Sequence, residues 1–382
     1  MERIRSLYIH LPWCRRKCPY CDFNSYPAPN LPEERQREYT AALLRNLRAL
    51  LDLHPGGDFR TVFAGGGTPS LFSPGILEDL LTGIDRMAGI AADAEITLEV
   101  NPGTAGPDEF RGFRRFASRL SFGIQSLDDR FLRALGRIHC AREAREAVDS
   151  ARMAGFDNIN ADMMYGLPGQ EIGDALEDLK QITALGLPHL SWYELTLEEG
   201  TPFGTNPPPG IPSEDTRAAM AEEGVRLLAD RGYRRYEISN FCQGSHECRH
   251  NLNYWEFGDY YGIGAGAHSK ITLEDERQIL RIPQEEEPRK YLRCLNFTAL
   301  GERVDPDYLM FQYFLNRARI RNVTIRQEDI LRKTFLPPET VNRGIRDLTG
   351  KGYLEVAPEG GHRVTEQGWR FGSALLRELL PD

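Results

Sequence analysis

Short apolar runs alternate with helical stretches through the first half of the chain, and this alternation constrains the fold most strongly. Six apolar or β-branched runs each end in a polar or glycine-rich turn, at 7–11, 61–64, 95–100, 120–125, 158–165 and 189–196. Helical periodicity fills the gaps between them, at 34–51, 75–87, 130–154 and 173–185. Strands that alternate with helices predict βαβ units and a parallel sheet. Because six units are too few for a closed eight-stranded barrel, the sequence predicts an α/β fold with an incomplete (β/α)6 barrel.

Beyond residue 196 the alternation ends and the organisation changes. The predicted elements there are a helix, a strand, a solvated acidic linker and a hairpin, at 218–231, 234–239, 273–287 and 353–365. Helices followed by a two-stranded hairpin are typical of a winged helix. The sequence therefore predicts three parts: the barrel core at 1–210, an accessory segment with a linker at 211–290, and a small winged-helix-like domain at 300–382.

Composition and charge exclude several classes of protein. Hydrophobic residues make up 41% and charged residues 27% of the 382 residues, as in an ordinary globular protein and unlike a disordered or collagen-like chain. Lys and Arg number 47 against 56 Asp and Glu, and this net charge of −9 argues against a protein that coats nucleic acid. No apolar stretch is long enough to span a bilayer, and residues 1–12 lack the core of a signal peptide. We therefore expect a cytoplasmic protein without a nucleic-acid partner.

Three cysteines lie close together directly after the first predicted strand. Cys14, Cys18 and Cys21 form the pattern C-x3-C-x2-C, in a chain whose seven cysteines we expect to stay reduced. Three thiolates on one short loop can hold three irons of a [4Fe–4S] cluster and leave the fourth iron open to an added ligand. The alternative is a structural zinc site, which normally has four protein ligands, and His10 is available as the fourth. The spacing favours the cluster.

A run of three glycines follows the second predicted strand, in Gly65-Gly66-Gly67-Thr68. Without a Cβ, glycine lets a ligand approach the backbone and reach its N–H and C=O groups. Ligands of open α/β sheets bind at the carboxyl ends of the strands. A triple glycine alone usually marks a turn, but in the unit that follows the cysteine loop it predicts part of a ligand site.

The cysteine spacing and the glycine run together resemble the radical S-adenosylmethionine (SAM) proteins, whose motifs are C-x3-C-x2-C and a GGGTP-type SAM contact. The resemblance implies a radical SAM barrel in which Cys14, Cys18 and Cys21 hold the cluster and the open iron binds the amino and carboxylate groups of SAM. It also implies SAM contacts at successive strand ends, at Tyr8, Gly66, Gly67, Thr68, Glu99, Gln125, Arg137 and Asp162. Carboxylates suit ribose hydroxyls and an ammonium group, and arginine suits a carboxylate.

Three further motifs are similar to those of the oxygen-independent coproporphyrinogen III oxidases and their relatives, at 122–126, 165–170 and 262–269. The oxidases carry another cysteine two residues after the third cluster ligand, where this chain has Phe23. The segment His250-Asn251-Leu252-Asn253-Tyr254-Trp255 is similar to the H-N-x-x-Y-W signature of HemW-type haem chaperones. This resemblance implies that the protein binds haem, with His250 as an iron ligand, and delivers haem to respiratory acceptor proteins. Spacing alone favours a different role for His250, as a histidine satisfied by hydrogen bonds in a polar turn.

Other functions and ligands stay open at this stage. The chain could instead be a radical SAM enzyme that acts on a tetrapyrrole, as a porphyrinogen oxidase, a haem-opening enzyme or a methyltransferase, so the sequence leaves open whether it catalyses a reaction. Cys242, His246, Cys248 and His250 form a second group of possible metal ligands, but their spacing is not that of a zinc site and we expect the grouping to be incidental. The resemblance to haem chaperones implies that cluster and SAM support haem transfer or the formation of a homodimer.

The charge of the C-terminal domain differs from that of the rest of the chain. Residues 311–351 contain nine basic side chains against four acidic ones, so this segment is +5 and the remainder is −14. Such a segment can dock an anionic membrane surface, whereas the alternative is a solvated helical face whose arginines pair locally. Because a haem chaperone must reach membrane-embedded acceptors, we expect salt-sensitive peripheral contact with the inner face of the membrane.

Overall fold

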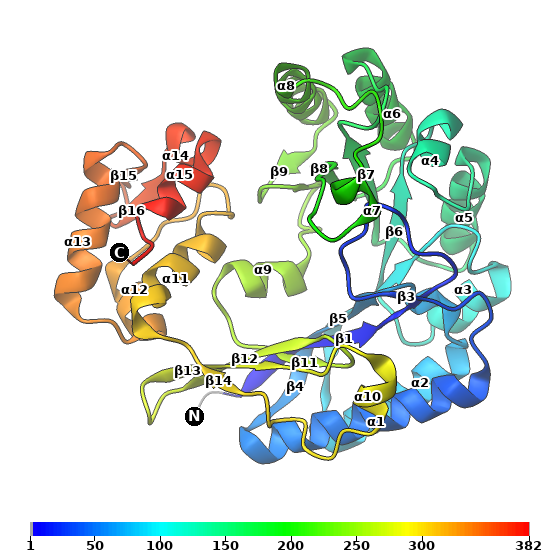
Figure 1. Ribbon diagram of the computed structural model, residues 1–382, viewed down its shortest axis with the longest axis horizontal. Helices are drawn as coiled ribbons and strands as arrows, with labels where there is room; N and C mark the ends of the chain where they lie inside the picture. Colours follow the sequence, from blue (N-terminus) through cyan, green and yellow to red (C-terminus); the bar gives the residue numbers. More distant parts are fainter. Residues whose placement is uncertain (1–2, 382) are drawn as a thin grey trace.

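The computed structural model describes residues 3–381, and its first half is built on six parallel strands. They pair in chain order and are β1 (Ile4–Leu11), β4 (Gly56–Gly66), β5 (Ile90–Val100), β6 (Arg119–Gln125), β7 (Ile159–Tyr165) and β8 (His189–Glu194). β11 (Tyr261–Ile263) extends one edge parallel to β1, and β10 (Asn240–Cys242) with β9 (Arg234–Arg235) extends the other edge antiparallel. Within the described residues these two edges do not pair with each other, so the barrel is open (Figure 1), as predicted.

The helices that connect these strands bury apolar side chains. They are α1 (Glu33–Leu53), α2 (Pro74–Ala88), α3 (Pro107–Phe113), α4 (Asp129–Ala134), α5 (Ala141–Met153) and α6 (Ile172–Ala184). All of them bury these side chains in one large core except α4, whose Phe131 packs in a smaller cluster with Met164. In α1, Tyr39, Leu43 and Leu47 recur at helical spacing and are fully buried. The prediction of one helix over 130–154 is wrong. Gly136 adopts a left-handed φ of 69° just after α4, which ends that helix and separates it from α5.

The accessory segment is more regular than its acidic composition indicated. It contains α8 (Glu214–Asp230), α9 (Arg249–Trp255) and an antiparallel hairpin of β12 (His268–Leu273) and β13 (Gln278–Pro283). The prediction of a solvated linker at 273–287 is therefore wrong. Ile282 of β13 is buried in the core of the barrel, and Ile279 is buried in the core of the C-terminal domain. The strand predicted at 234–239 is also too long, since the chain turns after β9 and returns as β10.

The C-terminal domain has the predicted arrangement of helices and a two-stranded wing. Its elements are α11 (Leu309–Arg317), α12 (Gln327–Thr334), α13 (Pro338–Gly350), the hairpin β15 (Leu354–Val356) and β16 (His362–Val364), α14 (Glu366–Arg370) and α15 (Gly372–Arg377). A second hydrophobic core, which includes Phe314 and Leu348, holds these elements together. In Figure 1 this domain lies beside the barrel, with α9 between the two. Within residues 3–381 no helix combines the length and apolarity needed to cross a bilayer.

Candidate functional site

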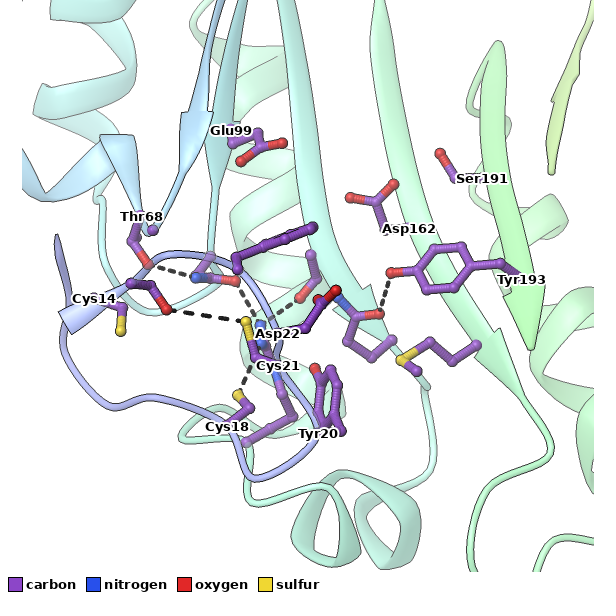
Figure 2. Close-up of a pocket in the computed structure, with 18 of the residues that line it drawn as sticks. Cys14, Cys18, Tyr20, Cys21, Asp22, Thr68, Glu99, Asp162, Ser191 and Tyr193 are labelled. Carbon is purple, nitrogen blue, oxygen red and sulfur yellow. Dashed lines mark hydrogen bonds between the residues drawn. The ribbon is translucent and has the colours of Figure 1, made fainter. Parts of the chain in front are cut away.

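A cavity of about 370 Å³ opens at the carboxyl ends of the parallel strands (Figure 2). All the residues predicted to bind the cluster or SAM line it, with Tyr8 as the exception: Cys14, Cys18, Cys21, Gly66, Gly67, Thr68, Glu99, Gln125, Arg137 and Asp162. They come from the cysteine loop, from β4, β5, β6 and β7 or the residues directly after these strands, and, for Arg137, from the turn between α4 and α5. The ends of parallel strands meet at one edge of a sheet, which is why residues far apart in the sequence converge here.

The cysteine loop is clamped at its base by two short parallel strands, β2 (Trp13–Cys14) and β3 (Tyr26–Pro27). The Ala28 N–H donates to the Cys14 carbonyl oxygen at 2.8 Å, and the Cys21 N–H donates to the Cys18 carbonyl oxygen at 3.1 Å. Burial raises the pKa of the Cys14 thiol to about 11. In the part of the chain that the structure describes, no three His, Cys, Asp or Glu side chains are gathered closely enough to hold a metal ion.

The donor chemistry of this loop fits a [4Fe–4S] cluster. Three thiols from one loop line one cavity, and Arg16 and Lys17 line the same cavity and offset the charge of bound thiolates. His10, the fourth ligand that a zinc site would need, uses both ring nitrogens elsewhere. Its Nδ1 lies 2.9 Å from the Tyr8 hydroxyl, and its Nε2 lies 2.8 Å from the Asn24 carbonyl oxygen. In this conformation His10 is therefore not available as the fourth ligand of a zinc ion.

The glycine run packs directly against the cysteine loop. The Gly67 N–H donates to the Leu11 carbonyl oxygen at 2.9 Å, and the Thr68 N–H donates to the Trp13 carbonyl oxygen at 2.7 Å. A Cβ on Gly67 would lie 2.5 Å from that Trp13 oxygen, so only glycine fits at this position. These contacts hold the end of β4 next to the cluster ligands.

Two of the carboxyl groups that line the cavity are predicted SAM contacts, Glu99 on β5 and Asp162 on β7. Desolvation and the nearby Asp162 raise the pKa of Glu99 to about 8, although the Gly66 N–H donates to its Oε2 at 3.1 Å. Desolvation also raises the pKa of Asp162, which accepts a hydrogen bond from Asn160 Nδ2 at 2.8 Å. A carboxyl held in a site of this kind is stabilised when a cationic ligand or a hydroxyl donor arrives.

Asn101 connects two of the predicted SAM contacts and was not itself predicted from the sequence. Its Nδ2 donates to Thr68 Oγ1 at 2.7 Å, and its Oδ1 accepts from Arg137 Nη2 at 2.6 Å. Asn101 follows Glu99 by two residues at the end of β5, and this position at a strand end was the available signal. Arg137 Nη1 in turn donates to Cys18 Sγ at 3.5 Å.

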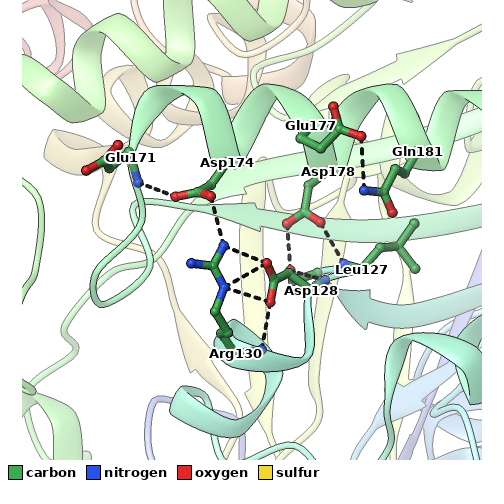
Figure 3. Close-up of polar contacts among 9 residues, drawn as sticks. Leu127, Asp128, Arg130, Glu171, Asp174, Glu177, Asp178 and Gln181 are labelled. Atoms are coloured by element: carbon green, nitrogen blue, oxygen red, sulfur yellow. Dashed lines mark hydrogen bonds and ion pairs between the residues drawn. The ribbon is translucent and has the colours of Figure 1, made fainter.

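Gln125 is held in an unusual backbone conformation by α6. Its φ is 73°, in the left-handed region that non-glycine residues rarely adopt, and its Oε1 accepts from the Tyr193 hydroxyl at 3.0 Å. Asp178 on α6 fixes the turn that follows, by accepting from Ser126 Oγ at 2.6 Å and from the Leu127 N–H at 2.8 Å. Figure 3 shows this anchor. Neither Tyr193 nor Asp178 was predicted, because each acts through a contact distant in the sequence.

A second cavity of about 310 Å³ adjoins the first, and Gly66 and Glu99 line both. Tyr8, the predicted SAM contact that is absent from the first cavity, lines the second together with Tyr254 and Tyr260. The predicted SAM contacts are therefore distributed over two cavities that share a wall. One extended ligand could contact the whole set.

His250 lies outside both cavities and is 1% exposed. Its Nδ1 lies 2.9 Å from Thr61 Oγ1, its Nε2 lies 2.9 Å from the Tyr254 hydroxyl, and its N–H donates to Glu95 Oε1 at 3.1 Å. Burial lowers the pKa of His250 to about 3, so the imidazole is neutral. This is the geometry of the hydrogen-bonded alternative, with His250 as the one buried residue of the helix α9 rather than in a polar turn. Haem ligation by His250 stays a prediction, and it requires at least one of these ring contacts to open.

The other possible metal ligands near α9 are not gathered into a site. Cys242 is fully buried beside Arg234, and Cys248 is fully buried with its Sγ 3.6 Å from Glu95 Oε1. His246 is exposed, and its Nδ1 lies 2.9 Å from the Gln243 carbonyl oxygen. These residues have packing and hydrogen-bonding roles.

Ion pairs neutralise much of the basic C-terminal segment. The pairs join Arg319 to Glu237, Arg321 to Glu366, Arg332 and Lys333 to Asp329, and Lys351 to Glu378. Arg317 is itself buried. Among the described residues, Arg326, Arg343 and Arg346 are exposed and form no ion pair. Local pairing, the alternative to membrane docking, therefore accounts for most of the segment.

Comparison with known proteins places this chain among radical SAM proteins. The model of the Radical SAM superfamily matches residues 8–182. The Heme chaperone HemW of Escherichia coli (strain K12) is 40% identical over 378 residues, which cover 99% of this chain and 98% of that protein. The protein of the same name from Haemophilus influenzae is 39% identical over 383 residues, which cover 99% of this chain and 98% of that protein. Among solved structures, coproporphyrinogen III oxidase (HemN) from Escherichia coli has the same fold, with a TM-score of 0.81, 22% identity, and coverage of 99% of this chain and 90% of that one.

Proposed function

We propose, from the premise that this chain belongs to the HemW family of radical SAM proteins, that it is a haem chaperone which binds haem and delivers it to an acceptor protein. The observation that carries the proposal is the similarity to HemW proteins over almost the whole chain, which includes the segment from His250 to Trp255 and the C-terminal domain. Phe23, at the position of the additional cysteine of the oxidases, supports the same choice.

In this proposal the cavity at the strand ends holds the two cofactors. Cys14, Cys18 and Cys21 would hold the [4Fe–4S] cluster, which supplies an open iron for SAM and a one-electron redox centre when it is bound. The predicted SAM contacts would hold SAM across the wall that the two cavities share. Glu99 would take up the cationic part of SAM, and binding would release the proton that Glu99 holds at neutral pH.

Haem would bind at the segment that contains α9, with His250 as a ligand of the iron. Both ring nitrogens of His250 are in hydrogen bonds, so haem binding there would require the contact with Thr61 or with Tyr254 to open. Tyr254 also lines the cavity that contains Tyr8 and Glu99. This shared side chain offers a route by which SAM could affect haem binding.

The acceptors in this proposal would be respiratory haem proteins. The chaperone would act in the cytoplasm, as a homodimer or a monomer. Within residues 311–351, Arg326, Arg343 and Arg346 are the exposed, unpaired charges proposed for peripheral contact with an anionic membrane. A radical SAM enzyme that acts on a tetrapyrrole is the second candidate function, supported by the complete set of predicted SAM contacts around the two cavities.

Anaerobic reconstitution followed by haem titration, with and without SAM, tests the proposal. A chaperone should bind haem with a defined stoichiometry, seen in the Soret band, and should form no 5′-deoxyadenosine above background when coproporphyrinogen III is added. Stoichiometric 5′-deoxyadenosine with that substrate would favour the enzyme. Failure of the reconstituted protein to bind haem would overturn the chaperone.

A further inference from the structure

Arg137 is fixed next to a cluster ligand by three hydrogen bonds. Its Nη2 donates to Asn101 Oδ1 and to the Gly123 carbonyl oxygen, both at 2.6 Å, and its Nη1 donates to Cys18 Sγ at 3.5 Å. The backbone is held as well, since the Arg137 N–H donates to the Leu132 carbonyl oxygen at 2.9 Å. The side chain therefore presents one N–H to the sulfur and cannot turn away without breaking two short bonds.

Arg137 lines the cavity as a predicted SAM contact and also has acceptors within the protein. In this conformation protein oxygens accept from its Nη2, and Cys18 Sγ accepts from its Nη1. Its Nε is buried and has no partner among the described residues. Figure 2 shows Cys18 on its loop below the strand ends, with a hydrogen bond to its sulfur. A positive charge with a donor on a cysteine sulfur is an arrangement that tunes iron–sulfur centres.

We propose that Arg137 raises the reduction potential of the cluster that Cys18 helps to hold. Reduction adds one electron from an external one-electron donor, breaks no bond, and makes the cluster and its thiolates more negative by one charge. The N–H of a guanidinium on the sulfur stabilises the more negative state more strongly, which moves the midpoint potential upward. The inference rests on the proposed function only for the presence of the cluster.

A redox titration of the reconstituted protein without SAM tests this role. The variant Arg137→Gln removes the charge and the fixed donor, so its midpoint potential should be more negative than that of the wild type. The potential is read from the electron paramagnetic resonance signal of the reduced cluster, after iron and sulfide analyses show equal loading. Arg16→Gln is the matched control. Arg16 is an exposed arginine on the cysteine loop that lines the same cavity, and the structure shows no bond from it to a cysteine sulfur. It should shift the potential less.

A second variant tests the fixed geometry separately from the charge. Asn101→Ala leaves the guanidinium in place but removes one of the two oxygens that hold its Nη2. The potential should fall by less than in Arg137→Gln, and this variant decides the question if Arg137→Gln does not assemble a cluster. Equal potentials in the wild type and in whichever of the two variants is loaded would overturn the proposal, as would a shift that occurs only with SAM present. A wild type that takes up no iron and sulfide would instead overturn the cofactor assignment itself.

Discussion

The cavity at the strand ends and the region where α9 packs on the barrel both contain side chains that could bind a ligand. In the cavity these side chains are accessible, whereas at α9 they are buried in contacts with the protein. In the cavity, cysteine thiols, a carboxyl with a raised pKa and an arginine face open space. At α9, His250 is 1% exposed, and its two ring nitrogens contact Thr61 and Tyr254. A ligand can enter the first region as it stands, whereas the second must first lose contacts that stabilise the fold.

The comparison shows what a sequence motif can and cannot specify. The segment from His250 to Trp255 resembles a family signature as closely as the cysteine loop does, yet in this conformation it joins the barrel to the C-terminal domain. Asn316 of α11 donates to the Tyr254 carbonyl oxygen at 2.6 Å, and the Arg319 guanidinium lies 4.3 Å from the centre of the Trp255 ring. A haem site at α9 would therefore be coupled to the packing of the C-terminal domain.

The largest expected effect is at the cysteine loop. Replacement of Cys18 by alanine should reduce iron and sulfide after reconstitution to background, because two thiolates cannot hold a cluster that has an open iron. Cys242→Ala is the matched control, since Cys242 is a buried cysteine that does not line the cavity and should keep full loading. Full loading of Cys18→Ala would show that the cavity is not the cluster site.

The next effect concerns α9. His250→Ala should lower the free energy of unfolding by about 3 kcal/mol, because it leaves a buried void and removes the partners of Thr61 and Tyr254. It should also weaken haem binding while the iron–sulfur absorbance stays unchanged. Chemical denaturation and a haem titration on one preparation measure both.

His246→Ala is the control for that variant, because His246 is exposed only four residues away. We expect it to leave both stability and haem affinity unchanged. An unchanged free energy of unfolding in His250→Ala would contradict the packed geometry of α9. Unchanged haem affinity would place haem elsewhere, at Cys242, Cys248 or His268.

The sequence predicted the barrel well, because the signals of its strands and helices are local. Six apolar runs with helical spacing between them are enough to indicate parallel βαβ units. The errors arose where distant contacts decide the structure. At 273–287 the acidic composition indicated a linker, but Ile279 and Ile282 pack into cores built by residues far along the chain. At 130–154 one glycine, Gly136, interrupts an otherwise continuous helical pattern.

The same distinction applies to the candidate site. Cys14, Gly67 and Glu99 could be predicted because each lies at or after a strand end, and such ends converge in a parallel sheet. Asp178 could not, because its contact with Ser126 joins residues 52 positions apart. Nor could the burial of His250, which depends on Thr61, 189 positions away.

A smaller effect is expected from the pH dependence of SAM binding. The pKa of Glu99 is raised to about 8, so this carboxyl is mostly protonated at pH 7 in the ligand-free protein. A cationic ligand needs the ionised form, and raising the pH supplies it. SAM affinity should therefore rise by up to about tenfold per pH unit below pH 8 and level off above it.

Calorimetric titrations with SAM between pH 6.5 and 9 measure this dependence. Since the amino group of SAM also titrates, the informative quantity is the difference between the wild type and Glu99→Gln. The variant should lose the contribution of Glu99 and bind SAM more weakly at pH 8.5. Identical pH profiles in the two proteins would show that Glu99 does not change protonation on binding.

The smallest expected effect concerns the charged face of the C-terminal domain. Some of its basic side chains are accessible, like those of the cavity, and others are held in contacts within the protein, like His250 of α9. Three arginines of residues 311–351 are in ion pairs, at 319, 321 and 332. In this part of the described chain Arg326, Arg343 and Arg346 are exposed without an ion pair. Each basic residue near an anionic surface contributes on the order of 1 kcal/mol, and salt reduces that contribution.

Co-sedimentation with anionic liposomes should therefore be weak and should decrease as the salt concentration rises. It should decrease further in Arg343→Ala and Arg346→Ala. A control variant, Arg332→Ala, removes an arginine that is in an ion pair with Asp329, and should have less effect. Equal sedimentation with anionic and neutral lipid, or none with either, would leave Arg326, Arg343 and Arg346 as a solvated face.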